Sequence, residues 1–390
     1  MASTMPGKCN WLKNSAHNLK LHSQDQGVRP VPVEIMDRNG DFVLDWNDVI
    51  LDIYTVAGDK IGSFPPEQIY IPDMIYSGLF PYYDPFDERM VYFDTDGDGC
   101  YSCQGDNYPP QMAFIIPHFE WGDNAETDPT SWYASWNQKM SELSMRWDYH
   151  KYSQGTTYAH LFKQGDRCVI QYWFYYPFNG CANQHEGDWE HINAILNSQN
   201  PSTVQIVKVV YYYHHSHLPV TNPELISQTH PRVYVGGYMH VNTGGQLFTG
   251  HGSHGSYPHA GHWSNVGALG MDEDVDGSGM EIDFGNYGNI VIMPNAEFVN
   301  NGHNNIHPYI DSYRNDLNWM VYNNFWGQPL SHPSAGESWF SIGGGILQYS
   351  LGAPLYYPGV WLGWWDEIPD NAGNVAPMGP VQHSSWEGSE

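Results

Sequence analysis

The sequence predicts a mainly β protein, with a jelly-roll-like β-sandwich core, an N-terminal calcium-loop region and a few helices. The 390-residue chain contains 28 Tyr and 16 Trp, which are residue types that favour strands. Its 40 Gly and 27 Pro indicate many turns between short strands. A hydrophobic content of 41% is enough for a large core. We expect two parts: residues 1–120 with two calcium loops, and residues 121–390 with the sandwich and a third loop.

The charge of the chain limits its partners. The formal net charge is −28, which disfavours nucleic acid and attracts cations. No apolar run approaches the length of a membrane span. The first twenty residues lack the apolar segment of a signal peptide. We expect an extracellular location with a signal that is not visible in this chain, and the cytoplasm is the alternative. The oligomeric state is left open.

The first predicted calcium loop covers residues 37–48. Acidic and amide side chains at loop positions 1, 3, 5, 9 and 12, with a backbone carbonyl at position 7, match the oxygen ligands that Ca²⁺ needs. Since the last ligand is Asp48, not Glu, the loop is closer to a dockerin repeat than to a calcium sensor. We expect an amphipathic helix over 49–54, and the alternative is an Asx-rich turn. The expected ligands are Asp37, Asn39, Asp41, Val43, Asp45 and Asp48.

Two further stretches have calcium-loop spacing, so we expect two to three Ca²⁺ sites in all. Residues 94–102 begin with D-x-D-G-D-G, a strong calcium signal. Cys100, in this stretch, and Cys103, just after it, indicate either a local disulfide or simple packing. The expected ligands are Asp94, Asp96, Asp98, Cys100, Ser102 and Asp106 in the second loop, and Asp272, Asp274, Asp276, Ser278 and Asp283 in the third.

The elements after residue 120 are predicted from hydrophobic periodicity. Apolar residues recur every three to four positions over 131–152, which predicts an amphipathic helix. Runs of β-branched and aromatic residues between turn residues predict strands. They lie near 167–176, 188–196, 203–214, 231–240 and 289–293.

The motif HEGDWEH, residues 185–191, begins one of these strands. Residues two apart in a strand share a face, so Asp188 and Glu190 point one way and Trp189 the other. We expect His185 to fold over from the preceding turn. An imidazole and two carboxylates suit a divalent cation: Mg²⁺, Ca²⁺, Mn²⁺ or Zn²⁺. The alternative is an ordinary solvated strand face beside a buried Trp.

Histidines concentrate downstream of this motif. We expect His214 and His215 to join the central metal, and His251, His254 and Tyr257 to bind the ligand. If the protein is an enzyme, the proton-transfer groups are Glu186, His191 and His254.

The motif HEGDWEHI after a YWFYYPFN run resembles the vacuolar-protein-sorting-associated 62 domain family over about residues 163–330. More distantly, His185, Asp188 and Glu190 are similar to the HRHDWE region of the necrosis- and ethylene-inducing-like proteins. That resemblance implies a secreted cytolysin with a β-sandwich and a divalent metal on these three residues. The second His of that motif is replaced by Gly187, so its role does not carry over.

These observations favour a secreted, metal-dependent protein that binds a glycan, a lipid headgroup or a small molecule and acts on membranes. One alternative is a metal-dependent hydrolase or lyase, because the ion would lower the pKa of a bound water. The other is a structural extracellular protein stabilised by calcium. Nucleic acid and a transmembrane segment are not expected.

Overall fold

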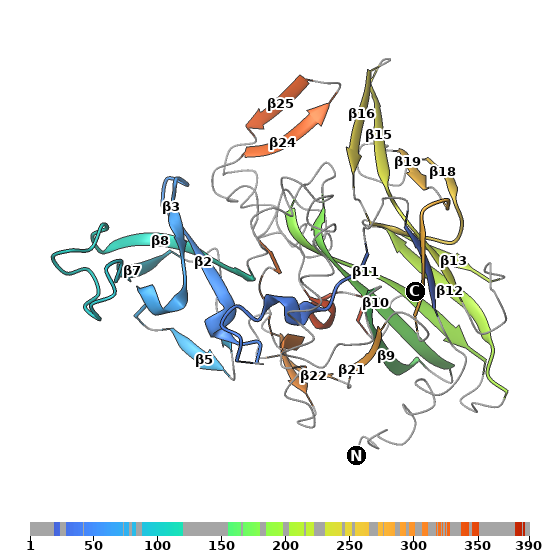
Figure 1. The fold of residues 1–390 in the computed structure, drawn as a ribbon, viewed down its shortest axis with the longest axis horizontal. Coiled ribbons are helices and arrows are strands. Elements are labelled where there is room, and N and C mark those ends of the chain that lie inside the picture. The colour runs from blue at the N-terminus through green and yellow to red at the C-terminus, as the bar shows by residue number, and fades with distance from the viewer. Residues whose placement is uncertain are drawn as a thin grey trace.

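In the computed structural model, the protein is mainly β and its strands form several sheets (Figure 1). Within the described residues, all helical structure is 3-10. It comprises η1 Val33–Met36, η2 Trp46–Asp48, η3 Pro66–Gln68 and η7 Pro380–Gln382, together with Leu317, Trp319 and Met320. The described residues are 19–23, 29–119, 155–164, 167–179, 185–197, 203–213, 216–221, 231–243, 246–251, 254–264, 272–284, 289–293, 296–300, 306–310, 317–327, 337–342, 345–350 and 379–386, less 42, 73, 78–79, 83–87, 276, 318, 321, 323, 325 and 384.

A six-stranded sheet of order β13-β12-β11-β10-β9-β21 forms the centre of the molecule. Its neighbours are antiparallel, except that β21 runs parallel to β9. The predicted strands near 167–176, 188–196, 203–214 and 289–293 are confirmed here, and the first two are longer than expected. The strands are β9 Thr156–Gln164, β10 Arg167–Asn179, β11 His185–Leu196, β12 Ile206–Tyr213, β13 Ser216–Val220 and β21 Asn289–Met293.

A four-stranded sheet of order β17-β14-β1-β20 shares one apolar core with the central sheet. Leu21 and Val233 of this sheet lie in the same buried cluster as Tyr172, Phe174 and Ile192 of the central one. Two sheets with a common apolar layer are a β-sandwich, as predicted. The first strand of the chain thus belongs to the sandwich. The strands are β1 Lys20–Ser23, β14 Arg232–Val235, β17 Ser256–Tyr257 and β20 Met280–Asp283.

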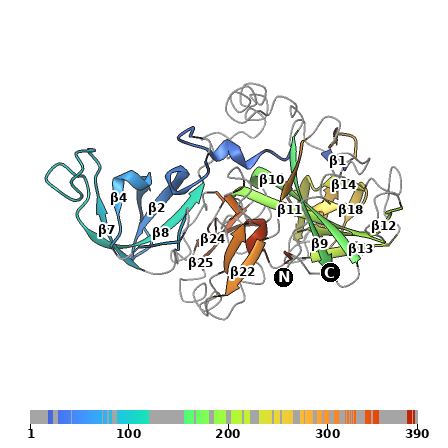
Figure 2. The same ribbon diagram turned by 90° about the horizontal axis from the view of Figure 1, so that it is seen from below.

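The N-terminal region forms a five-stranded sheet of order β3-β2-β8-β7-β4, which extends to one side of the sandwich (Figure 2). Its end is joined to the central sheet by a shared core, in which Phe119 packs on Tyr322 and Trp326. The Tyr322 hydroxyl also donates to the Pro117 carbonyl over 2.9 Å. The strands are β2 Val49–Thr55, β3 Lys60–Phe64, β4 Ile69–Tyr70, β7 Arg89–Phe93 and β8 Gln111–Phe119.

The helix expected over 49–54 is wrong, because this segment is the central strand β2. Val49, Leu51 and Ile53 face the apolar core, and Asp52 lies on the opposite face. There Asp52 accepts from Lys60 Nζ over 2.8 Å and from Ser63 Oγ over 2.6 Å. Strands β3 and β8 pair with its two edges, and side chains on both of its faces are buried. A run rich in β-branched residues favours such a strand over a helix.

A second four-stranded sheet, of order β16-β15-β19-β18, lies beyond the sandwich. The helix predicted over 131–152 lies outside the described residues. Among the described residues, no helix is long and apolar enough to cross a membrane. The remaining strands are β5 Ile75–Ser77, β6 Phe80–Tyr82, β15 Tyr238–Thr243, β16 Gln246–His251, β18 Gly261–Trp263, β19 Asp272–Val275, β22 Ala296–Asn300, β23 Ile306–Ile310, β24 Glu337–Ile342 and β25 Gly345–Ser350.

Candidate cation-binding sites

Strand β11 carries Asp188 and Glu190 on the face that packs on the sandwich core. Asp188 pairs with Tyr176 and Glu190 with Phe174 of β10, whose aromatic rings line that core. The two carboxylate residues are only 2% and 8% exposed. Trp189 lies on the other face, in the core shared with the N-terminal sheet. These acidic residues are therefore buried, which rules out a solvated strand face.

His254, in the segment just before β17, contacts Asp188. Its Nδ1 lies 2.8 Å from Asp188 Oδ2, and its ring stacks on Tyr176 with centroids 4.1 Å apart. Since Asp188 accepts, Nδ1 of His254 carries the proton and Nε2 can bind another group. His254 has a φ of 54°, a backbone conformation that a non-glycine residue rarely adopts. Strain of this kind at a buried side chain points to a functional position.

A third buried carboxylate, Glu273, lies next to this pair and was missed from the sequence. It comes from β19, is 0% exposed, and accepts a short hydrogen bond from the Tyr257 hydroxyl. Burial raises the pKa of Tyr257 well above its usual value, and the charges of Glu273 and Glu190 add to this effect. Glu190 and Glu273 both act on Tyr257, and Asp188 shares a strand face with Glu190, so we group the three carboxylates. We call Asp188, Glu190 and Glu273 the buried acidic set.

His191 lies on the opposite face of β11 and is not part of this neighbourhood. Its ring stacks between Trp173 and Tyr212, and its Nε2 lies 2.7 Å from the Ser385 hydroxyl. Burial, and then His383, keep the pKa of His191 well below its usual value. The expectation that His191 transfers protons beside Asp188 and Glu190 is therefore wrong, because the alternation of β11 directs its side chain the other way.

Gly187 explains why the motif lacks a second histidine. Its φ is 69°, and a Cβ at this position would lie 2.7 Å from the Trp326 carbonyl oxygen. That carbonyl accepts a hydrogen bond from the Tyr175 hydroxyl over 3.0 Å. No side chain fits between β11 and this contact, so Gly187 is required by packing.

Several predicted site residues have side chains outside the described part of the structure. His185 is the first residue of β11, paired with Asn179, and so belongs to the strand and not to the preceding turn. Nothing is described of its side chain. The same is true of Glu186 and His251, while His214, His215 and Asp276 lie outside the described residues altogether.

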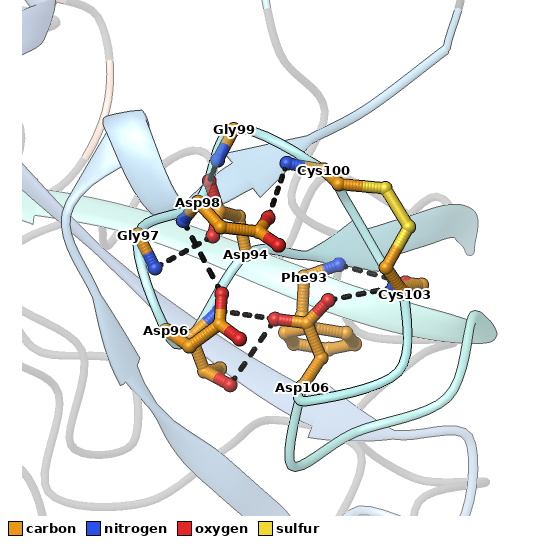
Figure 3. The surroundings of a disulfide bond; sticks show 11 residues. Phe93, Asp94, Asp96, Gly97, Asp98, Gly99, Cys100, Cys103 and Asp106 are labelled. Atoms are coloured by element: carbon orange, nitrogen blue, oxygen red, sulfur yellow. Dashed lines mark hydrogen bonds between the residues drawn. A yellow bond between two sulfur atoms is a disulfide. The ribbon is translucent and has the colours of Figure 1, made fainter.

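Residues 94–106, which we call the acidic loop, gather their carboxylates as the spacing predicts (Figure 3). Ligand oxygens of Asp94, Asp96 and Asp106 lie within 4.8 Å of one another, the only such group of three His, Cys, Asp or Glu side chains among the described residues. The carboxylate of Asp94 accepts from the backbone N–H groups of Gly97 and Gly99 over 2.8 and 2.9 Å.

Other parts of the acidic loop hold it in shape. A disulfide joins Cys100 to Cys103, in agreement with one of the two sequence interpretations. Asp106 accepts from the backbone N–H groups of Thr95 and Cys103 over 2.6 and 2.7 Å. Although partial burial opposes it, these hydrogen bonds lower the pKa of Asp106. The expected ligand Ser102 bonds elsewhere, since its hydroxyl accepts from the Phe93 N–H. Asp98 and Cys100 are joined to each other by a 2.7 Å hydrogen bond.

The loop at residues 37–48 binds its own backbone. Its most buried acidic side chain, Asp48, accepts from the N–H groups of Arg38 and Asn39 with one oxygen and of Asp45 with the other. Burial raises the pKa of Asp48 to about 6, and the backbone hydrogen bonds oppose this. Asp37, Asn39, Asp41 and Asp45 each accept from a backbone N–H two or three residues onward, and Val43 donates the one to Asp41.

The third predicted loop, residues 272–283, is wrong as a loop, because it forms strands of two different sheets. Asp272 and Asp274 lie on β19 and contact His262, whose Nδ1 lies 2.7 Å from Asp274 Oδ1. Asp283 lies on β20, close to Lys20 of β1. Ser278 is in the turn region between them. The alternation of β19 directs Glu273 inward instead, a period-two signal that the loop interpretation overlooked.

Comparisons with known proteins provide only distant likenesses. No known protein family matches the sequence, so the resemblance to the vacuolar-protein-sorting-associated 62 family has no support there. No curated protein matches it either. Three solved structures that do match are a non-toxic HaNLP3 protein, Necrosis and Ethylene inducing Protein 2 from the causal agent of cocoa's Witches Broom disease, and NLPPya in complex with glucosamine. Their identities are 13%, 16% and 13%, each with a TM-score of 0.22. The matches cover 35–36% of this chain and 51% of each neighbour, so the chain matches about half the length of these toxin-fold proteins.

Proposed function

We propose that this chain is a cation-dependent binding protein that recognises the hydroxyl-rich headgroup of a glycan or glycolipid at the buried acidic set. The observation that carries the proposal is the burial of Asp188, Glu190 and Glu273, with His254 contacting Asp188 and Tyr257 contacting Glu273. Placing three carboxylates in a low-dielectric region is costly, and a bound divalent cation is the usual compensation.

The donor type suits a hard divalent cation, although no three ligand atoms of Asp188, Glu190, Glu273 and His254 lie within 4.8 Å of one another. In this proposal Asp188 and Glu190 supply carboxylate oxygens, which Ca²⁺, Mg²⁺ and Mn²⁺ prefer. His254 orients Asp188 through its Nδ1 proton, the role that outer-sphere histidine and carboxylate pairs have in metal sites. When bound, the ion would supply a Lewis-acidic position for a hydroxyl or headgroup oxygen. His185, His214, His215 and His251 remain predicted contributors.

Tyr257 and Glu273 would form the other wall of the site. The Tyr257 hydroxyl keeps its proton and donates a hydrogen bond to Glu273, so the two groups together carry one negative charge beside Glu190. Tyr213 stacks on Tyr257 with centroids 5.0 Å apart, and Trp263 packs on it at 5.1 Å. Aromatic walls beside a cation suit a sugar, whose ring has an apolar face and whose rim carries hydroxyls. Tyr257 thus keeps its predicted role in ligand binding.

The test is metal content in the purified full chain, together with binding on a glycan array with and without chelator. Asp188→Asn should lose one divalent ion per chain and the chelator-sensitive glycan binding, while keeping the fold. Asp272→Asn is the matched control, because Asp272 is next to Glu273 on β19 but its carboxylate contacts exposed His262. Equal ion counts in wild type and Asp188→Asn, with binding retained, would disprove the proposal.

A hydrolase is the second candidate, favoured by the Asp188–His254 pair. A carboxylate that fixes the tautomer of a buried histidine leaves Nε2 available as a general base. In that case His254→Gln would abolish turnover of a glycoside or ester substrate while leaving metal content and binding unchanged. A binding protein would show no turnover in the wild type.

A further inference from the structure

On one face of the N-terminal sheet, the outer strands carry exposed apolar side chains, although an exposed face is normally polar. Val91 and Phe93 of β7 point into the core, so Met90 and Tyr92 point outward. Register continues this face across three strands, because Met90 pairs with Met112 of β8 and Tyr92 with Tyr70 of β4. We call the resulting surface of Tyr70, Met90, Tyr92, Tyr101 and Met112 the tyrosine face.

The tyrosine face is open to solvent. Tyr70 is 52% exposed, Met112 42%, and Met90 and Tyr101 37% each. The ring of Tyr70 lies between those of Tyr92 and Tyr101, with centroids 5.9 and 5.8 Å away. Taking roughly 200 Å² for a large side chain, the exposed apolar area is about 350 Å². That is less than half of the ~800 Å² per partner of a standard protein interface, so the area suits a small ligand better.

The aromatic surface is held rigid by the acidic loop. Tyr101 belongs to the turn that the Cys100–Cys103 disulfide closes, and its hydroxyl donates to the Glu67 carbonyl over 3.3 Å. The next residue, Ser102, exchanges two hydrogen bonds with the backbone of Phe93. Rings that are fixed before binding lose little entropy when a ligand stacks on them.

The rim of the tyrosine face is negatively charged and rich in acceptors. The side chain of Glu67 is 61% exposed although it pairs with Arg38 over 3.3 Å, and Asp96 and Asp98 are exposed in the acidic loop. These carboxylates, with a net charge of −28, repel phosphate groups and anionic membrane surfaces. They accept hydrogen bonds from hydroxyl groups. A ligand with an apolar face and a rim of hydroxyl donors is a pyranose sugar.

We propose that the tyrosine face is a saccharide-binding surface on which the sugar rings of a linear glycan stack, separate from the buried acidic set. Tyr70 is the central stacking residue, Tyr92 and Tyr101 extend the surface on its two sides, and Glu67 accepts from the sugar hydroxyls. Met90 and Met112 lengthen the apolar track along the strands. The surface would recruit the protein to a polysaccharide whether or not the central site binds a cation.

The test is calorimetric titration of the full chain in an Asp188→Asn background, which removes the proposed central site. The probes are linear hexasaccharides of glucose, N-acetylglucosamine, xylose and mannose. At least one should bind with a Kd below about 1 mM. Tyr70→Ala should weaken that binding at least tenfold, which is the loss expected of one stacking aromatic residue. Tyr70→Trp should retain it, because an indole also offers a flat face.

Matched variants decide between the outcomes. Val56→Ala truncates an apolar side chain of the same region that is also 52% exposed but lies outside the face, and should leave binding unchanged. The proposal is overturned if none of the four hexasaccharides binds, or if Tyr70→Ala binds them as the parent does. It is also overturned if Tyr70→Ala instead abolishes self-association in sedimentation without sugar, because the occupant would then be a second copy. Retained binding in Asp188→Asn together with lost binding in Tyr70→Ala separates this surface from the proposed central function.

Discussion

The acidic loop and the buried acidic set collect three carboxylates each by opposite routes. The acidic loop takes Asp94, Asp96 and Asp106 from thirteen consecutive residues, and backbone N–H groups bond to Asp94, which is buried, and to Asp106, which is partly exposed. The buried acidic set takes its members from β11 and β19, about eighty residues apart, and a histidine and a tyrosine contact them in the interior. Local carboxylates are thus held by backbone geometry, and distant ones by the packing of the whole sandwich. Substitutions near the buried acidic set should therefore reduce the stability of the fold more than substitutions in the acidic loop.

The largest expected effect is the loss of stability at one of two glycines that have nearly the same backbone φ. Gly187→Ala should destabilise the fold by about 3 kcal/mol or more, because its Cβ would meet the Trp326 carbonyl oxygen at 2.7 Å. Gly97 in the acidic loop has a φ of 75°, and a Cβ at this position would have no atom within 4 Å. Gly97→Ala should therefore cost only the backbone strain of about 1 kcal/mol. Chemical denaturation measures both. Equal losses would contradict the packing argument for Gly187.

Calcium should stabilise the protein through the acidic loop. The carboxylates of Asp94, Asp96 and Asp106 repel one another until an ion binds, and binding favours the native state. At a hundredfold excess of free Ca²⁺ over Kd the gain is about 2.7 kcal/mol, visible as a higher Tm. Asp96→Asn should reduce this gain, and Asp272→Asn should not. A melting curve that excess chelator leaves unmoved would disprove calcium binding here.

A pair of tyrosine hydroxyls sharpens the contrast between the interior and the surface. Tyr257→Phe removes the donor to a fully buried carboxylate, Glu273, and should cost about 2 kcal/mol. Tyr101→Phe removes an exposed hydrogen bond to the Glu67 carbonyl and should cost less than about 0.5 kcal/mol. Urea denaturation of the two single variants compares them directly. A loss at Tyr101→Phe as large as at Tyr257→Phe would remove the distinction.

The smallest predicted effect is a pH dependence at the loop of residues 37–48. Burial raises the pKa of Asp48 to about 6, so the folded state binds a proton more tightly than the unfolded chain, whose value is about 3.9. The stabilisation is full below pH about 4 and is lost as pH rises through about 6. After allowance for solvent screening, we expect about 1 kcal/mol. With chelator present, the free energy of unfolding should fall over this range in the wild type. A slope that persists in Asp48→Asn would assign it to another group.

Much of the fold follows from local sequence. Alternating and aromatic runs predict the strand pair β10 and β11, and the same alternation separates Asp188 and Glu190 from Trp189. The D-x-D-G-D-G spacing predicts the acidic loop, since all of its ligands lie within one turn of chain. These predictions succeed because period and spacing act over a few residues and need no distant partner.

Other features were decided only by tertiary structure. The run Val49–Thr55 is a strand because β3 and β8 pair with it on both sides, although its acidic neighbours suggest a calcium loop followed by a helix. Residues 272–275 are likewise held straight by β15 and β18, which turns Glu273 inward and Asp272 outward. His191 faces away from the carboxylates for the same reason as Trp189, and His254 reaches Asp188 across 66 positions.

The physical difference is the range of the interactions. Composition, periodicity and loop spacing determined that this chain is a β-sandwich with an acidic, cation-attracting surface and a carboxylate pair on one strand. Which carboxylates are buried, which histidine meets them and why residue 187 must be glycine depend on contacts between distant segments. Such contacts form only when the sheets pack, because no local rule sets which strands become neighbours.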